Sequence, residues 1–379
     1  MAAKIQILLA DHELMLRESV AAYLEDSGYI VHCVDDGEAA LEFYTNTPPD
    51  IIITELDLPK LSGLELMKKV RLVDQDMPLI VCTAVSNEHD IIHALRLGIY
   101  EYIIKPINDL SLIDQALQKA LEKKRLKIEN EKIRQTLLED QEAGKSVQEK
   151  ILPDSLYQKG DIKIEHHVEP MIYLSGDFID YFELDDDRFV FYLADVSGHG
   201  AAAAFVTVLI KMFIRELAAK YRSDGDERII VPHLMVRSLA QEIYSEKLGK
   251  YCTMLYFVYN KRLGELHYCV AGHYPNPILI QNNQPKVLPG RGFPVGISAS
   301  MSYKTEIIEP QSPFRVVLFS DGIFEILTGD FENKDHRLLE LLGQSDYSFE
   351  SINKVFKITT TPNRLDDIAT LIFSQGFTS

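Results

Sequence analysis

Five short apolar runs alternate with amphipathic segments over the first 108 residues of the chain. The runs are Ile5–Ala10, Tyr29–Cys33, Ile51–Thr54, Leu79–Cys82 and Tyr102–Ile104. The segments between them place apolar residues three and four positions apart, as in helices that bury one face. Short buried strands that alternate with helices are typical of a parallel, doubly wound α/β sheet. Ligands of such sheets bind beyond the carboxyl ends of the strands, so the residues there are the first candidates for a site.

Residues 109–152 have the composition of a single long helix. Between Leu110 and Ile151 the chain is rich in Leu, Glu, Lys and Gln and contains no Pro. Apolar residues recur along it at a spacing near seven and form an apolar seam, which consists of Leu126, Ile133, Leu137, Val147 and Ile151. Three residues interrupt this seam: Asn130, Asp140 and Gly144. Such a helix is about 60 Å long and has no core of its own, so we expect a homodimer to bury its seam. The alternative is a monomeric helix packed against a flanking domain.

Residues 153–379 are rich in strands that come in groups. The expected strands are Ile162–His167, Phe189–Ala194, Thr253–Tyr259, Glu265–Val270, Ile278–Gln281, Tyr303–Ile308, Arg315–Phe319 and Ala369–Phe373. The expected helices are Ala201–Tyr221, Val231–Glu246, Arg337–Gly343 and Phe349–Lys357. Grouped strands and paired helices, without strict alternation, indicate an α+β domain.

Composition and charge argue against several classes of protein. The net charge of −18 disfavours a nucleic-acid-binding protein, which needs a basic surface, and favours a cation site or protein partners. No apolar run reaches the roughly 18–20 residues that span a bilayer, so no membrane partner is expected. The four cysteines lie in apolar, strand-like surroundings without metal-ligand spacing, which is typical of buried residues in a reducing compartment. We therefore expect a cytoplasmic protein.

Four carboxylates of the C-terminal domain stand at strand ends. They are Asp177 in Ser175-Gly176-Asp177, Asp195 in the run Asp195–Gly200, Asp321 in Ser320-Asp321-Gly322 and Asp366 in Arg364-Leu365-Asp366-Asp367. Any one of them alone reads as an ordinary Asp-Gly turn or cap, but strand ends can also converge on one edge of a sheet sandwich. Oxygen donors without a histidine or thiolate set favour Mg²⁺ or Mn²⁺ over zinc. Two such ions, about 3.5–4 Å apart, lower the pKa of a bridging water and neutralise the oxygens of a phosphate ester. Convergence of the four carboxylates therefore predicts phosphoester hydrolysis without a protein nucleophile.

Seven short motifs in this domain follow the order found in a known enzyme family. They are Ser175–Asp180, Asp195–Gly200, Tyr251–Tyr256, Ala271–His273, Gly292–Gly296, Phe319–Glu325 and Asp366–Ile368. The domain resembles the PPM-type, metal-dependent serine/threonine phosphatases, in the bacterial branch that governs sporulation and stress sigma factors. The resemblance covers roughly residues 150–379. It implies an αββα sandwich that hydrolyses phosphoserine or phosphothreonine with two Mn²⁺ or Mg²⁺ ions.

The resemblance also assigns roles to individual residues. Asp195 matches the ligand that bridges the two ions, and the carbonyl of Val196 matches the ligand beside it. Asp177, Asp321 and Asp366 match further metal ligands.

Other residues of these motifs receive supporting roles. Asp367 is expected to support the loop, and Asp180 to stand behind the ligands or to partner a turn. His199 is a candidate proton donor, although a structural role in its Gly-His-Gly turn is favoured. His273 is expected to shape a turn near the site, and Thr253 to belong to a strand.

The N-terminal domain resembles the receiver domain of two-component response regulators over residues 1–108. In that family two acidic residues after the first strand bind Mg²⁺, an Asp accepts the phosphoryl group, and a Thr or Ser and a Lys respond to it. Here the acidic pair is Asp11-His12, and the acceptor position holds Glu55. Thr83 and Lys105 stand where the family has its responding residues.

Two departures at this receiver site argue against phosphorylation. His12 removes an oxygen ligand, which Mg²⁺ prefers. Glu55 is longer than Asp by about 1.5 Å and brings its carboxylate towards Lys105 and Thr83, as a partial mimic of a phosphoryl group. We predict a receiver that is not switched by phosphotransfer and rests near its active-like state, or alternatively a decayed domain kept for dimerisation. Asp57 is a poor substitute acceptor because it lies two residues away.

Together the two resemblances imply a signalling phosphatase with a receiver domain. The expected substrate is a phosphorylated anti-sigma-factor antagonist, with an anti-sigma kinase or a sensor kinase acting as a separate protein. One rival hypothesis is a non-catalytic adaptor that binds a sigma factor or its regulator; the four retained carboxylates disfavour it. Another is a phosphatase gated by ordinary receiver phosphorylation, which needs Asp in place of Glu55.

Overall fold

The computed structural model describes residues 4–84, 88–327, 334–358 and 366–377. They form two compact units that divide between Leu137 and Leu138, inside the helix α5 (Ser111–Ile151). Arg364 and Leu365, which precede the expected ligand Asp366, lie outside the described ranges. Within these ranges no helix is both long enough and apolar enough to cross a membrane.

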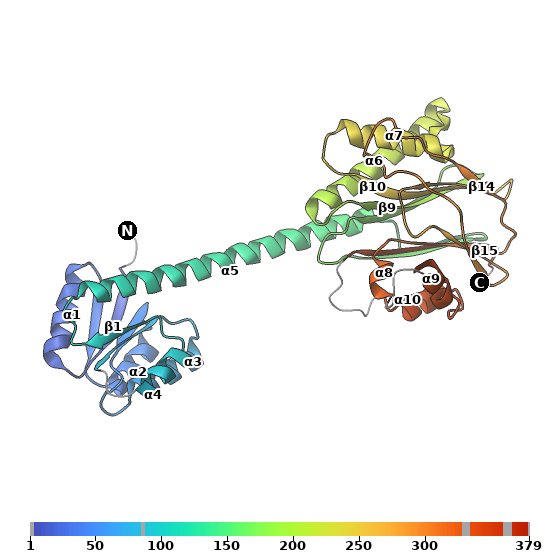
Figure 1. Ribbon diagram of the computed structural model, residues 1–379. Helices are drawn as coiled ribbons and strands as arrows, with labels where there is room; N and C mark the ends of the chain where they lie inside the picture. The colour runs from blue at the N-terminus through green and yellow to red at the C-terminus, as the bar shows by residue number, and fades with distance from the viewer. Residues whose placement is uncertain (1–3, 85–87, 328–333, 359–365, 378–379) are drawn as a thin grey trace. The chain divides into compact units, whose positions relative to one another are not determined.

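The first unit contains a five-stranded parallel sheet with strand order β2-β1-β3-β4-β5 (Figure 1). Its strands are β1 (Gln6–Ala10), β2 (Ile30–Val34), β3 (Ile51–Thr54), β4 (Leu79–Ala84) and β5 (Glu101–Lys105). Its helices, besides the start of α5, are α1 (Leu14–Asp26), α2 (Gly37–Asn46), α3 (Gly63–Val73) and α4 (Glu88–Arg96). This is the doubly wound α/β fold that the alternating apolar runs predict.

Helices cover both faces of this sheet, and each face has its own core. Residues of α1 and of the first turns of α5 pack on one face, among them Leu24 and Leu117. Residues of α2, α3 and α4 pack on the other, among them Tyr44, Leu66 and Ala94. Burial on both faces explains why the strands are continuous apolar runs.

The second unit contains two antiparallel sheets. The first has the strand order β14-β11-β10-β9-β8, and the second has the order β13-β12-β15-β16-β7-β6. The strands of the first sheet are β8 (Asp177–Glu183), β9 (Arg188–Val196), β10 (Cys252–Asn260), β11 (Glu265–Ala271) and β14 (Glu306–Ile308). Those of the second are β6 (Leu156–Lys159), β7 (Ile162–Glu169), β12 (Ile278–Gln281), β13 (Gln284–Val287), β15 (Phe314–Phe319) and β16 (Ile368–Gln375).

Helices lie on the outer faces of both sheets, so the second unit is a four-layered αββα sandwich (Figure 1). α6 (Ala201–Asp224), the short 3₁₀ helix η1 (Glu227–Ile230) and α7 (Pro232–Ser245) cover the first sheet. α8 (Ile323–Ile326), α9 (Lys334–Leu342) and α10 (Phe349–Phe356) cover the second sheet. Between the sheets, the Phe191 ring stacks on Phe257 at 4.7 Å and on Phe373 at 4.6 Å, and all three are fully buried.

The elements differ from the sequence-based expectation in a few places. α5 runs without a break through Asp140 and Gly144, where the apolar seam is interrupted. Three strands were not expected, namely β6, β8 and β13. β14 begins at Glu306, three residues later than expected.

Candidate functional site

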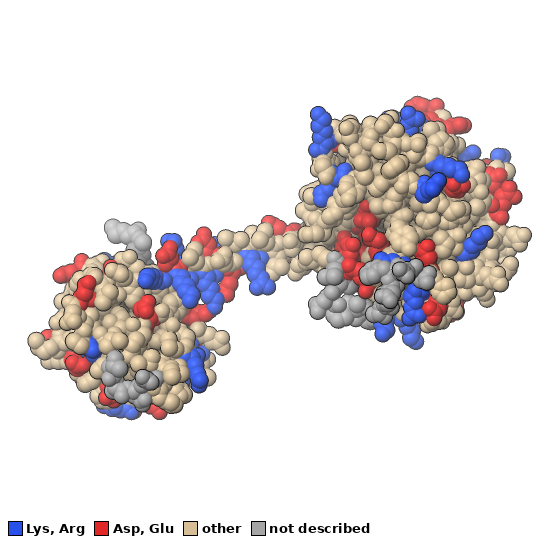
Figure 2. All heavy atoms as spheres, viewed as in Figure 1, with Lys and Arg blue, Asp and Glu red and all other residues tan. Residues whose placement is uncertain are grey.

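Two adjacent strands of the first sheet bring the first pair of carboxylates together. Asp177 is the first residue of β8, and it pairs in register with Asp195, the last residue but one of β9. The second sheet supplies Asp321 just after β15 and Asp366 just before β16. A pocket of about 410 Å³ is lined by Asp195, Val196, Asp321, Asp366 and Asp367, among others. Acidic side chains gather in a hollow on the visible face of this unit (Figure 2).

Burial and mutual repulsion change the protonation of these carboxylates. Burial, followed by repulsion from Asp321 and Asp366, raises the pKa of Asp195 to about 7. Burial and the Asp195 charge raise the pKa of Asp177 well above its usual range, and burial also raises the pKa values of Asp321 and Asp366. Like charges that share a site resist joint ionisation unless a cation joins them.

The donor set fits a hard divalent cation. Asp177 is 3% exposed, and its Oδ2 atom has no hydrogen-bond partner in the described part of the chain. Buried carboxylate oxygens are normally paired, so an unpaired oxygen close to other carboxylate charges suits a positively charged ligand. In the described ranges, three ligand atoms lie within 4.8 Å of one another only at Asp11, His12 and Glu55, so these carboxylates are more widely spaced.

The raised pKa of Asp195 predicts how pH affects the metal-free protein. Its folded-state pKa of about 7 exceeds the unfolded value of about 3.9. Between these two pH values, the folded chain therefore binds more protons than the unfolded chain. Stability therefore decreases as pH rises from about 4 to about 7, and added Mn²⁺ stabilises more at pH 8 than at pH 5.

Scanning calorimetry in a chelating buffer, repeated with Mn²⁺, measures this effect on the phosphatase unit. The decrease in melting temperature between pH 5 and pH 8 should become smaller in Asp195→Asn, which cannot ionise. An equal decrease in the two proteins would contradict the assignment to Asp195.

Asp367 faces the backbone of a neighbouring loop. Its Oδ1 accepts a hydrogen bond from the Met171 N–H at 2.6 Å, and its Oδ2 accepts one from the Gly176 N–H at 2.7 Å. Gly176 is itself required by a close approach, because a Cβ there would lie 2.7 Å from the Val196 carbonyl oxygen. Asp367 thus fixes the loop that presents Asp177.

A buried histidine stands behind Asp195. The His273 Nε2 atom lies 2.8 Å from the Phe319 carbonyl oxygen, and its Nδ1 atom lies 2.7 Å from the Thr253 hydroxyl. Burial lowers the pKa of His273 to about 4, so the ring is neutral, and the carbonyl requires the proton on Nε2. Nδ1 then accepts the Thr253 hydroxyl hydrogen, and the Asp195 Oδ2 atom, 3.5 Å from that hydroxyl, stays available to a cation.

Asp180 lies outside the pocket and forms a buried ion pair. Its side chain is fully buried, and its Oδ2 lies 3.4 Å from the Lys211 Nζ atom and 3.3 Å from an Arg215 guanidinium nitrogen. The two cations belong to α6, so this contact fastens that helix to β8.

Several residues at the site had no role assigned from the sequence. Ser320 is fully buried, and its hydroxyl accepts a hydrogen bond from the Ala369 N–H at 2.8 Å. The Gln148 side chain of α5 pairs with the backbone of Ser175, at 2.7 and 3.0 Å, two residues before Asp177. Ser320 belongs to a recognised motif, whereas no sequence pattern pointed to Gln148.

His199, for which the sequence suggested a role, lines the pocket at the turn before α6.

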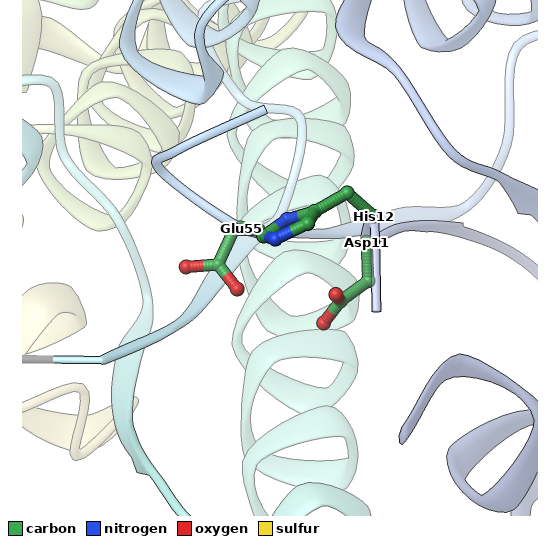
Figure 3. A group of neighbouring side chains, drawn as sticks. All are labelled: Asp11, His12 and Glu55. Atoms are coloured by element: carbon green, nitrogen blue, oxygen red, sulfur yellow. The ribbon is translucent and has the colours of Figure 1, made fainter. Parts of the chain in front are cut away.

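The receiver site brings three potential ligand residues together at the carboxyl ends of β1 and β3. One ligand atom from each of Asp11, His12 and Glu55 lies within 4.8 Å of the others (Figure 3). Asp11 and Glu55 are 3% exposed, whereas His12 is exposed. Asp57 is exposed and lines a pocket together with Thr83.

Lys105 neutralises the carboxylates of this receiver site. Its Nζ atom lies 2.8 Å from Asp11 and 2.9 Å from Glu13, and it also forms an ion pair with Glu55. Burial alone lowers the pKa of Lys105, but hydrogen bonds to Asp11, Glu55 and Glu13 outweigh it and raise that pKa above its usual range. The cation of the site is therefore supplied by the chain itself.

Replacing Lys105 with Met is expected to lower the free energy of unfolding of the receiver by about 3 kcal/mol, because Asp11 and Glu55 remain buried without a counter-charge. Urea denaturation measures the loss. Lys69→Met, at an exposed lysine of α3, is the matched control and should change stability by less than about 0.5 kcal/mol. Adding Glu55→Gln to Lys105→Met should recover part of the lost stability, because it removes one of the two unpaired buried charges. Equal losses in Lys105→Met and Lys69→Met would contradict a stabilising role for the ion pairs of Lys105.

Comparisons with known proteins match both units. The model of the family described as Stage II sporulation protein E (SpoIIE) matches residues 185–375, and the model of the response regulator receiver domain matches residues 7–118. The chain is 21% identical to the Regulator of RpoS from Escherichia coli over 70% of this chain and 81% of that protein. It is 29% identical to the Regulatory protein AtoC of Escherichia coli over 36% of this chain, and the match spans only 30% of AtoC.

A solved structure supports the fold of the second unit. The SiaA-PP2C domain of Pseudomonas aeruginosa matches with a TM-score of 0.53 and 19% identity, over 64% of this chain and 97% of that domain. This likeness shows a PP2C-type fold.

Proposed function

Because the chain belongs to the SpoIIE family and carries a response regulator receiver domain, we propose that it is a metal-dependent phosphatase acting on phosphoserine or phosphothreonine of a signalling protein. The observation that supports this proposal is that Asp195, Asp321 and Asp366 line one pocket, beside Asp177, whose Oδ2 atom has no hydrogen-bond partner within the described residues. Family membership alone leaves open whether a given chain retains the ligands.

In this proposal the four carboxylates and the Val196 carbonyl would hold two Mn²⁺ or Mg²⁺ ions. When bound, such ions supply Lewis-acid chemistry for hydrolysis of a phosphate ester by water. The chain contributes positioning: Asp367 fixes the loop before Asp177, and neutral His273 holds the Thr253 hydroxyl hydrogen away from Asp195. Oxygen donors suit both metals, and the proposal leaves the choice between them to measurement.

The proposed substrate is the phosphorylated form of an anti-sigma-factor antagonist. This follows from the resemblance to the sigma-factor-regulating branch of the family. A separate anti-sigma kinase would add the phosphate that this protein removes, and a sensor kinase is the other partner proposed to act in trans.

A second candidate function is a non-catalytic binding protein of a sigma-factor pathway. The observation that favours it is the match with the Regulator of RpoS, which spans 70% of this chain. The retained carboxylates favour the enzyme, since a binding protein has no need of acidic side chains that line one pocket and stand beside a further buried one.

Hydrolysis of p-nitrophenyl phosphate with Mn²⁺, by the wild type and by Asp195→Asn, tests the proposal. Activity in the wild type alone supports the enzyme. Equal rates in the two proteins, or no rate in either, would leave the binding protein as the better hypothesis.

The receiver is proposed to act without phosphotransfer. Lys105, which in the resembling family responds to a phosphoryl group, is already paired with the Glu55 carboxylate and with Asp11. A carboxylate carries less charge than a phosphoryl group, so Glu55 mimics the phosphorylated state in part. A conventional phosphorylation-gated phosphatase is the third hypothesis, and it requires an acceptor that this position lacks.

The apolar seam of α5 is proposed to bind a second copy of the chain. Leu126, Ile133, Leu137 and Val147 are each 46–59% exposed. Heptad-related apolar side chains of a helix are stabilised by pairing with a second helix, which supports a homodimer.

A further inference from the structure

A groove borders the phosphatase pocket within the second unit. It has a volume of about 530 Å³ and lies between the end of α7, the segment 247–251 and the backbone at Gly296 and Ile297. Tyr251 lines both the groove and the carboxylate pocket. The groove therefore begins where the proposed reaction site ends.

The wall between groove and pocket is held by hydrogen bonds on both sides. On the pocket side, the Tyr251 carbonyl accepts from the Ser197 N–H at 2.9 Å, and the Tyr251 N–H donates to the Ser197 hydroxyl at 3.2 Å. On the groove side, Cys252 and Val295 exchange backbone hydrogen bonds of 2.9 and 2.7 Å. The groove thus has a fixed position relative to Asp195.

The loop at Gly296 is also fixed against α7. Gly296 has a φ of +92°, and a Cβ there would lie 2.5 Å from the Ile243 side chain. Only glycine permits this approach, which seats Ile297 across the groove from the end of α7. The groove is therefore present before any ligand binds.

The groove is largely apolar and also carries two lysines, one of which lies towards the carboxylate pocket. Tyr244, Leu248, Tyr251 and Ile297 are each 44–52% exposed. Lys247 and Lys250 also line it, and neither forms an ion pair with a carboxylate within the described ranges. The Lys250 ammonium donates to the Ser197 carbonyl at 2.8 Å, which places it at the rim of the carboxylate pocket. Two lysines that form no ion pair with a described carboxylate, in a chain of net charge −18, attract an anionic group to the groove.

We propose that this groove binds the polypeptide next to the phosphorylated residue, and that its partner is a protein segment with apolar side chains beside a phosphoserine. The proposal rests on the phosphatase function proposed above. With the phosphate at the carboxylate pocket, a chain that continues past Tyr251 enters the groove. Its apolar side chains contact Leu248 and Ile297, and Lys250 faces the phosphate from the side. A small phosphate ester has no atoms that reach this surface.

The test compares substrates that do and do not extend into the groove. The full-length protein with Mn²⁺ is given p-nitrophenyl phosphate and two phosphoserine peptides of equal length and charge. One peptide has Leu and Ile on both sides of the phosphoserine, and the other has Gly and Ser. The groove variant is Leu248→Ser with Ile297→Ser, and the matched control is Leu263→Ser, which replaces a leucine that is 56% exposed at the turn between β10 and β11.

In the groove variant, the ratio of kcat/KM for the apolar peptide to kcat/KM for p-nitrophenyl phosphate is expected to fall about 20-fold, chiefly through KM. The ratio for the Gly/Ser peptide, and all ratios in Leu263→Ser, should stay within about twofold. Fluorescence polarisation of the labelled apolar peptide gives the same comparison as Kd and does not depend on turnover.

Unchanged ratios and an unchanged Kd in the groove variant would overturn the proposal. The same result together with loss of a dimer in sedimentation would assign the groove to a second copy of the chain, which also overturns it. If the wild type hydrolyses none of the substrates, the phosphatase function fails. A weaker Kd for the apolar peptide in the groove variant alone would then still support the groove as a binding surface.

Discussion

Asp195→Asn is expected to lower the Mn²⁺-dependent rate of phosphoester hydrolysis on the order of 10³-fold or more. Asp195 pairs in register with Asp177 across β8 and β9, and the Asp321 charge raises its pKa, so in the proposed site its carboxylate would serve both ions. Asparagine keeps the shape but removes the charge, and a loss of about 4 kcal/mol of transition-state stabilisation corresponds to about 10³-fold in rate.

The measurement is kcat with p-nitrophenyl phosphate over a range of Mn²⁺ concentrations. Asp186→Asn is the matched control, because Asp186 is an exposed carboxylate of the same unit, in the turn between β8 and β9. It should keep the wild-type rate within about twofold. A rate for Asp195→Asn that returns to the wild-type value at high Mn²⁺ would indicate a ligand that sets metal affinity only, and the bridging assignment would be wrong.

The sequence predicted most of the helices and strands from composition and apolar pattern. α5 was expected from Leu110 to Ile151 on composition alone and spans Ser111–Ile151. β6 and β13 were missed because they are edge strands, and most of their side chains are exposed or only partly buried. Such strands carry little hydrophobic signal.

β8 was missed for a different reason. Its side chains are almost all buried, yet Asp180 interrupts the apolar run. Lys211 and Arg215 of α6 neutralise this carboxylate, and both are more than 30 residues away in the chain. Sequence periodicity contains no information about a charge pair formed across such a distance, so the strand did not look like a buried one.

The candidate ligands were found because strand ends followed by acidic residues and glycine form a visible pattern. Which of them meet depends on the pairing of β8 with β9 and on the stacking of the two sheets, and the family resemblance supplied that information. The residues that position the ligands leave no such pattern. Gln148 contacts Ser175 through a helix of mixed polar composition, and Lys250 reaches Ser197 from a surface loop.

At the receiver site, the longer side chain of Glu55 brings its carboxylate to Lys105. The sequence indicated that Glu55 extends towards Lys105, and the structure has this ion pair. It also adds Glu13, a third carboxylate on the same ammonium. Because Glu13 sits in the loop after β1, the one lysine joins the carboxyl ends of β1, β3 and β5.

The receiver with His12→Asp and Glu55→Asp is expected to accept about one phosphoryl group per chain from a small phosphodonor with Mg²⁺, whereas the wild type accepts none. Asp at position 12 restores an oxygen ligand for Mg²⁺. Asp at position 55 withdraws the carboxylate by about 1.5 Å from Lys105 and leaves room for in-line attack. Intact mass, and a label stable to acid but labile to base, measure the modification.

Asp57→Asn in both backgrounds removes the neighbouring carboxylate as a substitute acceptor. Stoichiometric label on the wild-type receiver would show that Glu55 does not block phosphotransfer, and the third hypothesis would replace the unswitched receiver. If the double variant stays unlabelled, the domain has decayed beyond these two positions and serves another purpose, such as dimerisation.

The phosphatase rates of the wild type, Glu55→Asp and Glu55→Ala separate a receiver held in its active-like state from a decayed receiver. If Glu55 holds the active-like state through Lys105, removing its carboxylate changes the rate, whereas in a decayed receiver the three rates agree.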